Sequence, residues 1–159
     1  MGLGTDQSDQ PGKKLRPMKY DRYLAEETVL NKHLLPNTFV FNNPTGIKPS
    51  LRIAAQTNSG NLYTLYMDLS NFPESKPDVY VTKMLKTRDG EKMSGCSGTM
   101  HTLTSKKGMT QICHYSATYW SPNVSLFKVF IKCRLWLEMY EAHLRTGQPI
   151  DYYLKHQTS

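Results

Sequence analysis

The hydrophobic pattern near the start of the chain is typical of one amphipathic helix. From Met18 to Leu35, apolar residues recur at mostly helical spacings with charged residues between them. The apolar positions are Tyr20, Tyr23, Leu24, Leu30 and Leu34. Pro36 cannot continue a helix, so the pattern predicts a helix over residues 18–35 that ends before this proline.

The middle third of the chain shows the alternation that is typical of β-strands. Four short runs are separated by clusters rich in Asn, Ser, Gly and Pro. The runs are Thr38–Phe41, Leu51–Thr57, Leu62–Leu69 and Val79–Leu85, and the turns are residues 42–46, 58–61 and 72–77. Consecutive strands joined by tight turns pair antiparallel, so the sequence predicts a four-stranded antiparallel meander.

Residues 86–122 show no periodicity and are rich in Gly, Ser and Thr. A long irregular segment inside a compact domain is typical of a functional loop. Its second half contains larger apolar residues, which predict that this part packs against the domain. They are Ile112, Tyr115, Tyr119 and Trp120.

A second helix follows, over Val124–Thr146. Pro122 suits a first helical turn, Ser121 or Asn123 can cap it, and Gly147 and Pro149 end it. One stripe of this helix is apolar and predicts that it covers the sheet. The stripe consists of Leu126, Val129, Phe130, Cys133, Trp136, Leu137, Tyr140 and Leu144.

The ends and the composition set further limits on the class of protein. Residues 1–17 are nearly free of apolar groups, so we expect a flexible tail before a single α+β domain over residues 18–159. The tail carries a small basic cluster of Lys13, Lys14, Arg16 and Lys19. The net charge of +7 suits an acidic partner or nucleic acid. No secretory signal, no membrane-spanning run and an odd number of cysteines predict a cytoplasmic protein with free thiols.

Several short motifs follow one another between the predicted strands and the second helix. They are Phe72-Pro73, Pro77-Asp78-Val79, His101, Gly108, Ile112-Cys113 and Trp120-Ser121-Pro122, with Leu126 and Val129 behind them. Their order resembles that of the ubiquitin-conjugating enzyme (UBC) family. The family has Tyr-Pro and Pro-Pro pairs, then His-Pro-Asn, Gly, Ile-Cys-Leu and Trp-Ser-Pro. The resemblance covers residues 18–146 and is most specific over residues 72–130. It implies the UBC fold, in which the sheet and the long helix hold an active-site loop.

The resemblance implies that Cys113 is a catalytic nucleophile. In the family this cysteine carries the C-terminus of a ubiquitin-like protein as a thioester and passes it to an amine, usually a lysine. A thiol on an irregular segment held by a rigid scaffold suits that chemistry. His114, next to the nucleophile, is a candidate for proton transfer near neutral pH. No cofactor and no metal are implied.

The sequence departs from the family at His101-Thr102-Leu103, where proline and asparagine are both absent. The family's asparagine is credited with stabilising the oxyanion during attack by the amine. His101 matches the family's histidine, for which a structural role in the active-site loop is usual. Backbone amides, His114, Thr104 or Ser105 are the candidates to replace the missing donor.

The resemblance also implies partners. An activating enzyme must act in trans, and the first helix would dock it through Arg22, Lys19 and Lys32. Short UBC-like proteins with such departures resemble the conjugating component of bacterial antiphage operons, notably the short type II CBASS kind. There the cargo is the C-terminus of a cGAS-like nucleotidyltransferase, so we expect a transferase in antiviral defence.

Several other functions are weighed against this one. The main alternative is an inactive UBC-like adaptor that binds a ubiquitin-like protein or scaffolds a complex. A nucleic-acid binder fits the charge and the tyrosines, but the charges are dispersed and no reading motif appears. A zinc site of Cys96, His101, Cys113 and His114 lacks the usual tight ligand pairs. A Cys-His protease would need a histidine that only the fold can place.

Overall fold

The computed structural model describes residues 16–156, which form a mixed α+β fold. Its elements are α1 (Tyr20–His33), β1 (Phe39–Asn42), β2 (Ser50–Gln56), β3 (Leu62–Asp68), β4 (Asp78–Val81), β5 (Thr102–Lys106), β6 (Met109–Ile112), the 3-10 turn η2 (Ala117–Tyr119), α2 (Leu126–Thr146) and α3 (Ile150–His156). Most of the predicted tail lies outside the described residues. Met18 is fully buried and is the first core residue of the described range.

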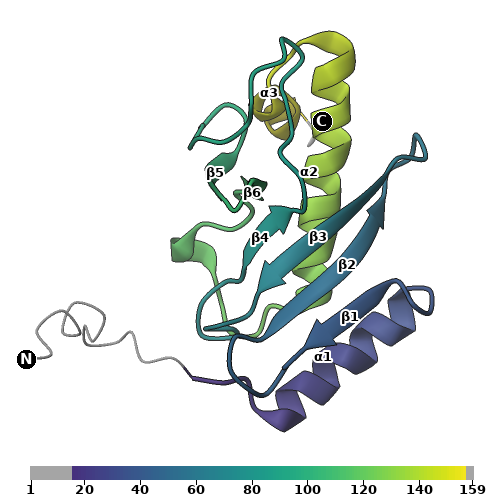
Figure 1. Cartoon of the computed structure of the whole chain (residues 1–159), viewed down its shortest axis with the longest axis vertical. Helices are drawn as coiled ribbons and strands as arrows, with labels where there is room; N and C mark the ends of the chain where they lie inside the picture. Colours follow the sequence, from purple (N-terminus) through teal and green to yellow (C-terminus); the bar gives the residue numbers. More distant parts are fainter. Residues whose placement is uncertain (1–15, 157–159) are drawn as a thin grey trace, which may run out of the picture.

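All six strands belong to one antiparallel sheet with the order β1-β2-β3-β4-β6-β5 (Figure 1). The first four strands form the predicted meander, and the connection at residues 58–61 closes the β2–β3 hairpin. The prediction of four strands was wrong, however. Residues 102–112, which we expected to be irregular, form a hairpin of β5 and β6, and β6 pairs with β4 through Val79 and Ile112.

The β5–β6 hairpin was missed because its strands are short and polar. Their sequences, TLTSK and MTQI, lack the apolar alternation that marks β2 and β3. The turn between them is tight, with Lys106 paired to Met109. Lys107 and Gly108 both have positive φ values, 51° and 72°, as a two-residue hairpin turn requires. The Lys-Gly pair between Thr-rich segments was the signal available in the sequence.

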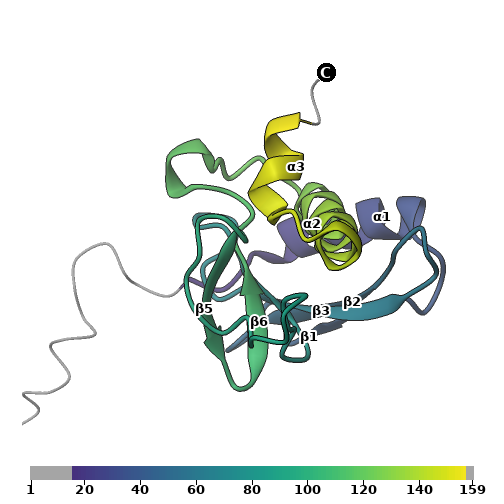
Figure 2. The ribbon, with the colours of Figure 1, turned by 90° about the horizontal axis from the view of Figure 1, so that it is seen from above.

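Helix α2 lies across one face of the sheet, with α1 and α3 on the same side of it (Figure 2). Its Leu126, Val129 and Leu137 are fully buried, opposite Leu51, Leu65 and Val79 of the strands. The prediction for the cap was wrong: Ser125, not Ser121 or Asn123, accepts the Lys128 N–H. The predicted end is confirmed, because Gly147 adopts a left-handed φ of 82° at the C-cap.

Helix α1 contributes less apolar surface to the core than its pattern predicted. Its only buried residues are Leu30 and Glu26, while Tyr20 is 65% exposed. Glu26 is buried because it has polar partners. One carboxylate oxygen accepts the backbone N–H of Leu126 at 2.8 Å and the other accepts Arg22 Nε at 2.7 Å. Glu26 therefore caps the start of α2 from another helix.

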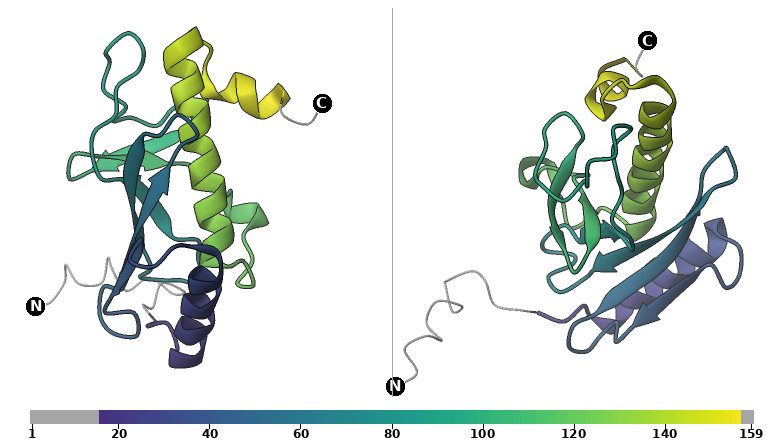
Figure 3. Two further views of the ribbon diagram at one scale, coloured as in Figure 1. Left: turned by 90° about the vertical axis from the view of Figure 1, so that its right-hand side faces the viewer. Right: turned by 45° about the horizontal axis from the view of Figure 1, so that its top comes forward.

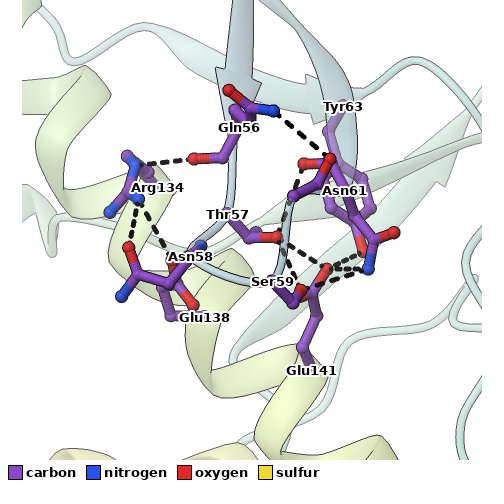
Figure 4. A network of polar contacts seen from close by, with 10 residues as sticks. Gln56, Thr57, Asn58, Ser59, Asn61, Tyr63, Arg134, Glu138 and Glu141 are labelled. Carbon is purple, nitrogen blue, oxygen red and sulfur yellow. Dashed lines mark hydrogen bonds and ion pairs between the residues drawn. The ribbon is translucent and has the colours of Figure 1, made fainter.

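A second buried carboxylate ties the β2–β3 hairpin to α2. Glu141 accepts four side-chain hydrogen bonds from the hairpin, and we call this set the Glu141 network (Figure 4). The donors are Thr57 at 3.1 Å, Ser59 at 2.5 Å, Asn61 at 2.9 Å and Tyr63 at 2.7 Å. These hydrogen bonds lower the pKa of Glu141 in spite of its burial, so the carboxylate is ionised at neutral pH.

The short helix α3 turns away from the upper end of α2 (Figure 3). The sequence pattern did not predict it. Ile150 at its start is fully buried and anchors it to the core. Within residues 16–156, no helix combines the length and the apolar character needed to cross a membrane.

Candidate active site

Cys113 lies where the chain leaves the sheet. It follows Ile112, the last residue of β6, and its backbone N–H donates to the His101 carbonyl at 3.0 Å. This bond extends the β5–β6 ladder by one residue. On the other side, the β4–β6 register continued by one residue places Asp78 beside Cys113. The residue is half-buried, so the strand end holds a cysteine that is partly exposed.

His101 supports this strand end mainly through its backbone. Its carbonyl also accepts the indole N–H of Trp136 at 3.1 Å, so the oxygen joins Cys113 to α2. Its ring Nε2 donates to Asp151 Oδ1 of α3 at 2.8 Å. The structural role that the resemblance implies for His101 fits this geometry.

His114 is held by the turn before β4. Its Nε2 lies 2.7 Å from the Pro77 carbonyl and must donate, because that oxygen only accepts. Its Nδ1 is shielded from solvent and has no partner among the described residues. Burial lowers the pKa of His114 to about 4, so the ring is neutral and weakly basic at pH 7. This environment favours a positioning role over proton transfer near neutral pH.

An aromatic cluster fixes the segment that follows the candidate nucleophile. The Tyr115 ring packs edge-on against Trp120, with centroids 5.5 Å apart, and Lys132 of α2 lies 3.9 Å from the Tyr115 centroid. Trp120 Nε1 donates to the Pro73 carbonyl at 2.8 Å. The predicted packing of this segment is therefore right for Tyr115 and Trp120. It was wrong for Tyr119, which is 80% exposed on η2.

A surface hollow of about 390 Å³ is lined by Asp78, the residue that the extended β4–β6 register places beside Cys113. Three carboxylates, Asp68, Glu74 and Asp78, line it together with Lys76 and Trp120. Asp68 and Asp78 face each other across β3 and β4. Carboxylates beside a thiol favour the approach of a cationic amine over that of an anion.

The positions that replace the family's proline and asparagine supply no side-chain donor to Cys113. Thr102 is buried, and its hydroxyl donates to the Gly95 carbonyl at 2.8 Å. Leu103 has no polar group. Thr104 and Ser105, two candidates from the sequence, lie farther along β5, because Thr102 already pairs with Ile112. The Nε2–H of His114, a further candidate, already donates to the Pro77 carbonyl, so backbone amides are the remaining sequence candidates.

The other two cysteines have different surroundings. Cys133 is completely buried in α2, and burial raises the pKa of its thiol strongly. Cys96 is exposed in the loop before β5. Among the described residues, no group of three His, Cys, Asp or Glu side chains is placed to hold a metal ion. The four residues of the zinc alternative are therefore not brought together.

The cations expected to dock an activating enzyme are not equally free. Lys19, just before α1, and Lys32, within α1, are both exposed. Arg22 is instead engaged inside the domain. It bonds Glu26, donates to the Val124 carbonyl at 3.1 Å and lies 4.9 Å from the Phe72 ring centroid. Arg22 therefore joins α1 to the start of α2, and a partner would meet the two lysines first.

Two residues near Cys113 escaped the sequence analysis. Asp78 was noted only as part of a motif, and Asp151 was not considered. Pairing of β6 with β4 brings the first to the site, and α3 brings the second. Neither pairing was predicted, so no local signal marked these carboxylates.

Comparisons of the chain with protein-family models, with curated protein sequences and with solved structures find no match. A function for this chain is therefore argued from its own residues and their geometry. The resemblance of the short motifs to the UBC family stays a prediction beside that geometry. What the structure gives directly is a half-buried cysteine at a strand end, bonded through its N–H to the His101 carbonyl and placed by the register beside Asp78, which lines an acidic hollow.

Proposed function

We propose that Cys113 accepts the C-terminus of another protein as a thioester and passes it to an amine. The cargo is a ubiquitin-like protein or a cGAS-like nucleotidyltransferase, activated by a separate enzyme. The antiphage context is part of this proposal and depends on the resemblance alone. The observation that carries the chemistry is the place of Cys113. It is the one described cysteine that is both held at a strand end by a ladder hydrogen bond and partly exposed.

The proposed reaction has two steps. In the first, the Cys113 thiolate attacks the activated carbonyl, a carbon–sulfur bond forms and the acyl group leaves its previous carrier. In the second, a neutral amine attacks the thioester, an amide bond forms and the carbon–sulfur bond breaks. The amine gives up a proton to solvent and the Cys113 thiol is restored. A thioester suits this step because it is activated toward amines.

The acidic hollow supports an amine as the acceptor. Asp78 and Asp68 lie in line with Cys113 across the sheet and place negative charge where a protonated lysine would approach. The lysine gives its ammonium proton to solvent before its neutral amine attacks the thioester. Such charges raise the local concentration of a cationic acceptor and orient it. In this proposal, Asp78 and Asp68 select the acceptor and Cys113 does the chemistry.

A second candidate function is the inactive adaptor. The observation that favours it is the absence of a side-chain donor at Thr102 and Leu103, because an oxyanion in this position would depend on backbone amides. An adaptor would bind the same partners without a covalent intermediate. The two candidates therefore differ in one measurable quantity, the mass of the protein.

Intact-mass analysis after co-expression with the products of the neighbouring genes tests the proposal. We expect a mass increment equal to a partner protein less one water, lost on treatment with a thiol reductant. Cys113→Ala should abolish the increment, and Cys96→Ala should leave it unchanged. Binding of the same partner without any increment in the wild-type protein would support the adaptor and contradict the transferase.

A further inference from the structure

Helix α3 contacts the loop that supports Cys113. The backbone N–H of Asp151 donates to the Thr99 carbonyl at 2.8 Å. Asp151 Oδ1 also accepts the His101 ring N–H at 2.8 Å, and its Oδ2 pairs with Lys155 at 3.0 Å. One residue of α3 thus holds both ends of the turn from Thr99 to His101.

The turn needs such support because His101 has a φ of 51°. A non-glycine residue in the left-handed region persists when its surroundings fix it. Here the ring is held by Asp151 and the carbonyl by the Cys113 N–H and Trp136 Nε1. The ring and the carbonyl belong to the same residue, so a movement of the His101 ring should directly displace the His101 carbonyl.

We propose that Asp151 is a positioning residue for Cys113, acting through His101. Its carboxylate keeps the His101 ring in place, which keeps the His101 carbonyl aimed at the Cys113 N–H and the thiol at a fixed point of the strand end. Asp151 does not touch the reacting atoms. The inference extends the proposed function, because it assigns a use to the position of Cys113 in acyl transfer.

The contacts predict which variants preserve the effect. Asp151→Ala removes the acceptor for the His101 ring. Asp151→Asn keeps an oxygen at the same place and should rescue it. Lys155→Ala is the matched control, since it removes the partner of Oδ2 and leaves the His101 contact intact. Asp151 is exposed enough that these variants should fold.

Hydrogen exchange of the Cys113 amide is the first readout, because it needs no partner protein. We expect at least tenfold faster exchange in Asp151→Ala and less than twofold change in Asp151→Asn and Lys155→Ala. The amide of Leu65, in β3, should exchange at the wild-type rate in all three. Unchanged protection of the Cys113 amide in folded Asp151→Ala would overturn the inference.

The rate of thioester formation is the second readout. We expect it to fall about tenfold in Asp151→Ala and to stay near the wild-type rate in the other two variants. A wild-type loading rate in Asp151→Ala would overturn the inference and leave the proposed function standing. Absence of any thioester in wild-type protein would instead contradict the proposed function. In that case the exchange data alone would decide whether Asp151 fixes Cys113.

Discussion

The Glu141 network and the Cys113 site are built alike but differ in how many of their side-chain atoms are hydrogen-bonded. Each joins an irregular turn next to the sheet to the C-terminal helices. In the Glu141 network, four hydrogen bonds from the β2–β3 hairpin converge on a single carboxylate (Figure 4). A group with this many partners has little capacity left for a ligand. The arrangement therefore indicates a structural anchor.

At the Cys113 site, by contrast, the backbone is hydrogen-bonded, whereas side-chain atoms of Cys113 and His114 have no hydrogen-bond partner among the described residues. The Cys113 N–H is bonded, but no described side chain forms a hydrogen bond or ion pair with its thiol. His114 is held by one ring nitrogen while the other has no partner among the described residues. The comparison shows that the number of polar groups does not distinguish a candidate active site. What distinguishes it is a side chain with unused hydrogen-bonding capacity on a rigid backbone.

The largest effect should follow from breaking the Glu141 network. Glu141→Ala leaves the buried Tyr63 and Thr57 hydroxyls without their acceptor, so the free energy of unfolding should fall by about 4 kcal/mol. Denaturant unfolding measures it. The matched control is Glu138→Ala, one turn earlier, whose carboxylate accepts only the Asn58 N–H and pairs with Arg134. A loss below about 1 kcal/mol for Glu141→Ala would contradict a structural anchor.

Acid should act on the Cys113 site through His114. Burial lowers the pKa of His114 to about 4 in the folded chain, and the unfolded value is near 6.5. Between these two values the unfolded chain binds the proton and the folded chain does not. The free energy of unfolding should therefore fall as the pH drops from about 6.5 to about 4, by up to about 3 kcal/mol.

The His114→Gln variant isolates this effect. Glutamine can still donate to the Pro77 carbonyl but does not titrate, so the loss over this pH range should be smaller than in wild type. The carboxylates of Glu141 and Asp151 have lowered pKa values. Their protonation therefore reduces the free energy of unfolding only below the ordinary carboxyl pKa near 4, outside the range in which His114 acts. Parallel pH profiles for the two proteins would show that His114 is not kept neutral by the fold.

A smaller, kinetic effect should sharpen the comparison at the acidic hollow. Asp78→Asn should slow transfer from Cys113 to lysine about tenfold, or about 1.4 kcal/mol in the barrier. Thioester formation should change less than twofold, and discharge by neutral hydroxylamine should not change. Asp89→Asn, an exposed carboxylate elsewhere, is the control. Equal slowing with lysine and hydroxylamine would show that Asp78 does not select a cationic acceptor.

The smallest effect should be the change in the free energy of unfolding on substitution of Cys133, the buried cysteine of α2. Cys133→Ala removes one buried sulfur from the α2 stripe, so the free energy of unfolding should fall by about 1 kcal/mol. Thioester formation should be unchanged. A loss of the thioester in folded Cys133→Ala would remove the distinction between a buried structural thiol and Cys113.

Periodicity predicted those parts of the fold that bury a continuous apolar face. The β2–β3 hairpin alternates cleanly, and α2 carries a long stripe from Leu126 to Tyr140, so both were found. Strands β5 and β6 were missed because they are stabilised by pairing, of β5 with β6 and of β6 with β4, and they lack apolar alternation. Glu26 and Glu141 were missed as interior residues, since a helical pattern assigns carboxylates to the solvent face.

At the candidate site, too, some features could be predicted from the sequence and others depend on tertiary contacts. Cys113 was predicted as a nucleophile from the order of motifs, and its place at the end of β6 is compatible with that prediction. The contacts of His101, Asp78 and Asp151 depend on strand register and on α3, which the local sequence does not encode. Those contacts decide which groups surround Cys113, so the sequence could name a candidate nucleophile but not its neighbours.

The most direct test of the central claim is site-resolved labelling of the three cysteines. The co-expressed protein is treated with N-ethylmaleimide, then with hydroxylamine to cleave thioesters, and then with iodoacetamide before peptide mass analysis. We predict that the second label appears on Cys113 alone, that Cys96 carries the first label and that Cys133 stays unlabelled until denaturation. Complete reaction of Cys113 with the first reagent, or the second label on Cys96 instead, would contradict the account.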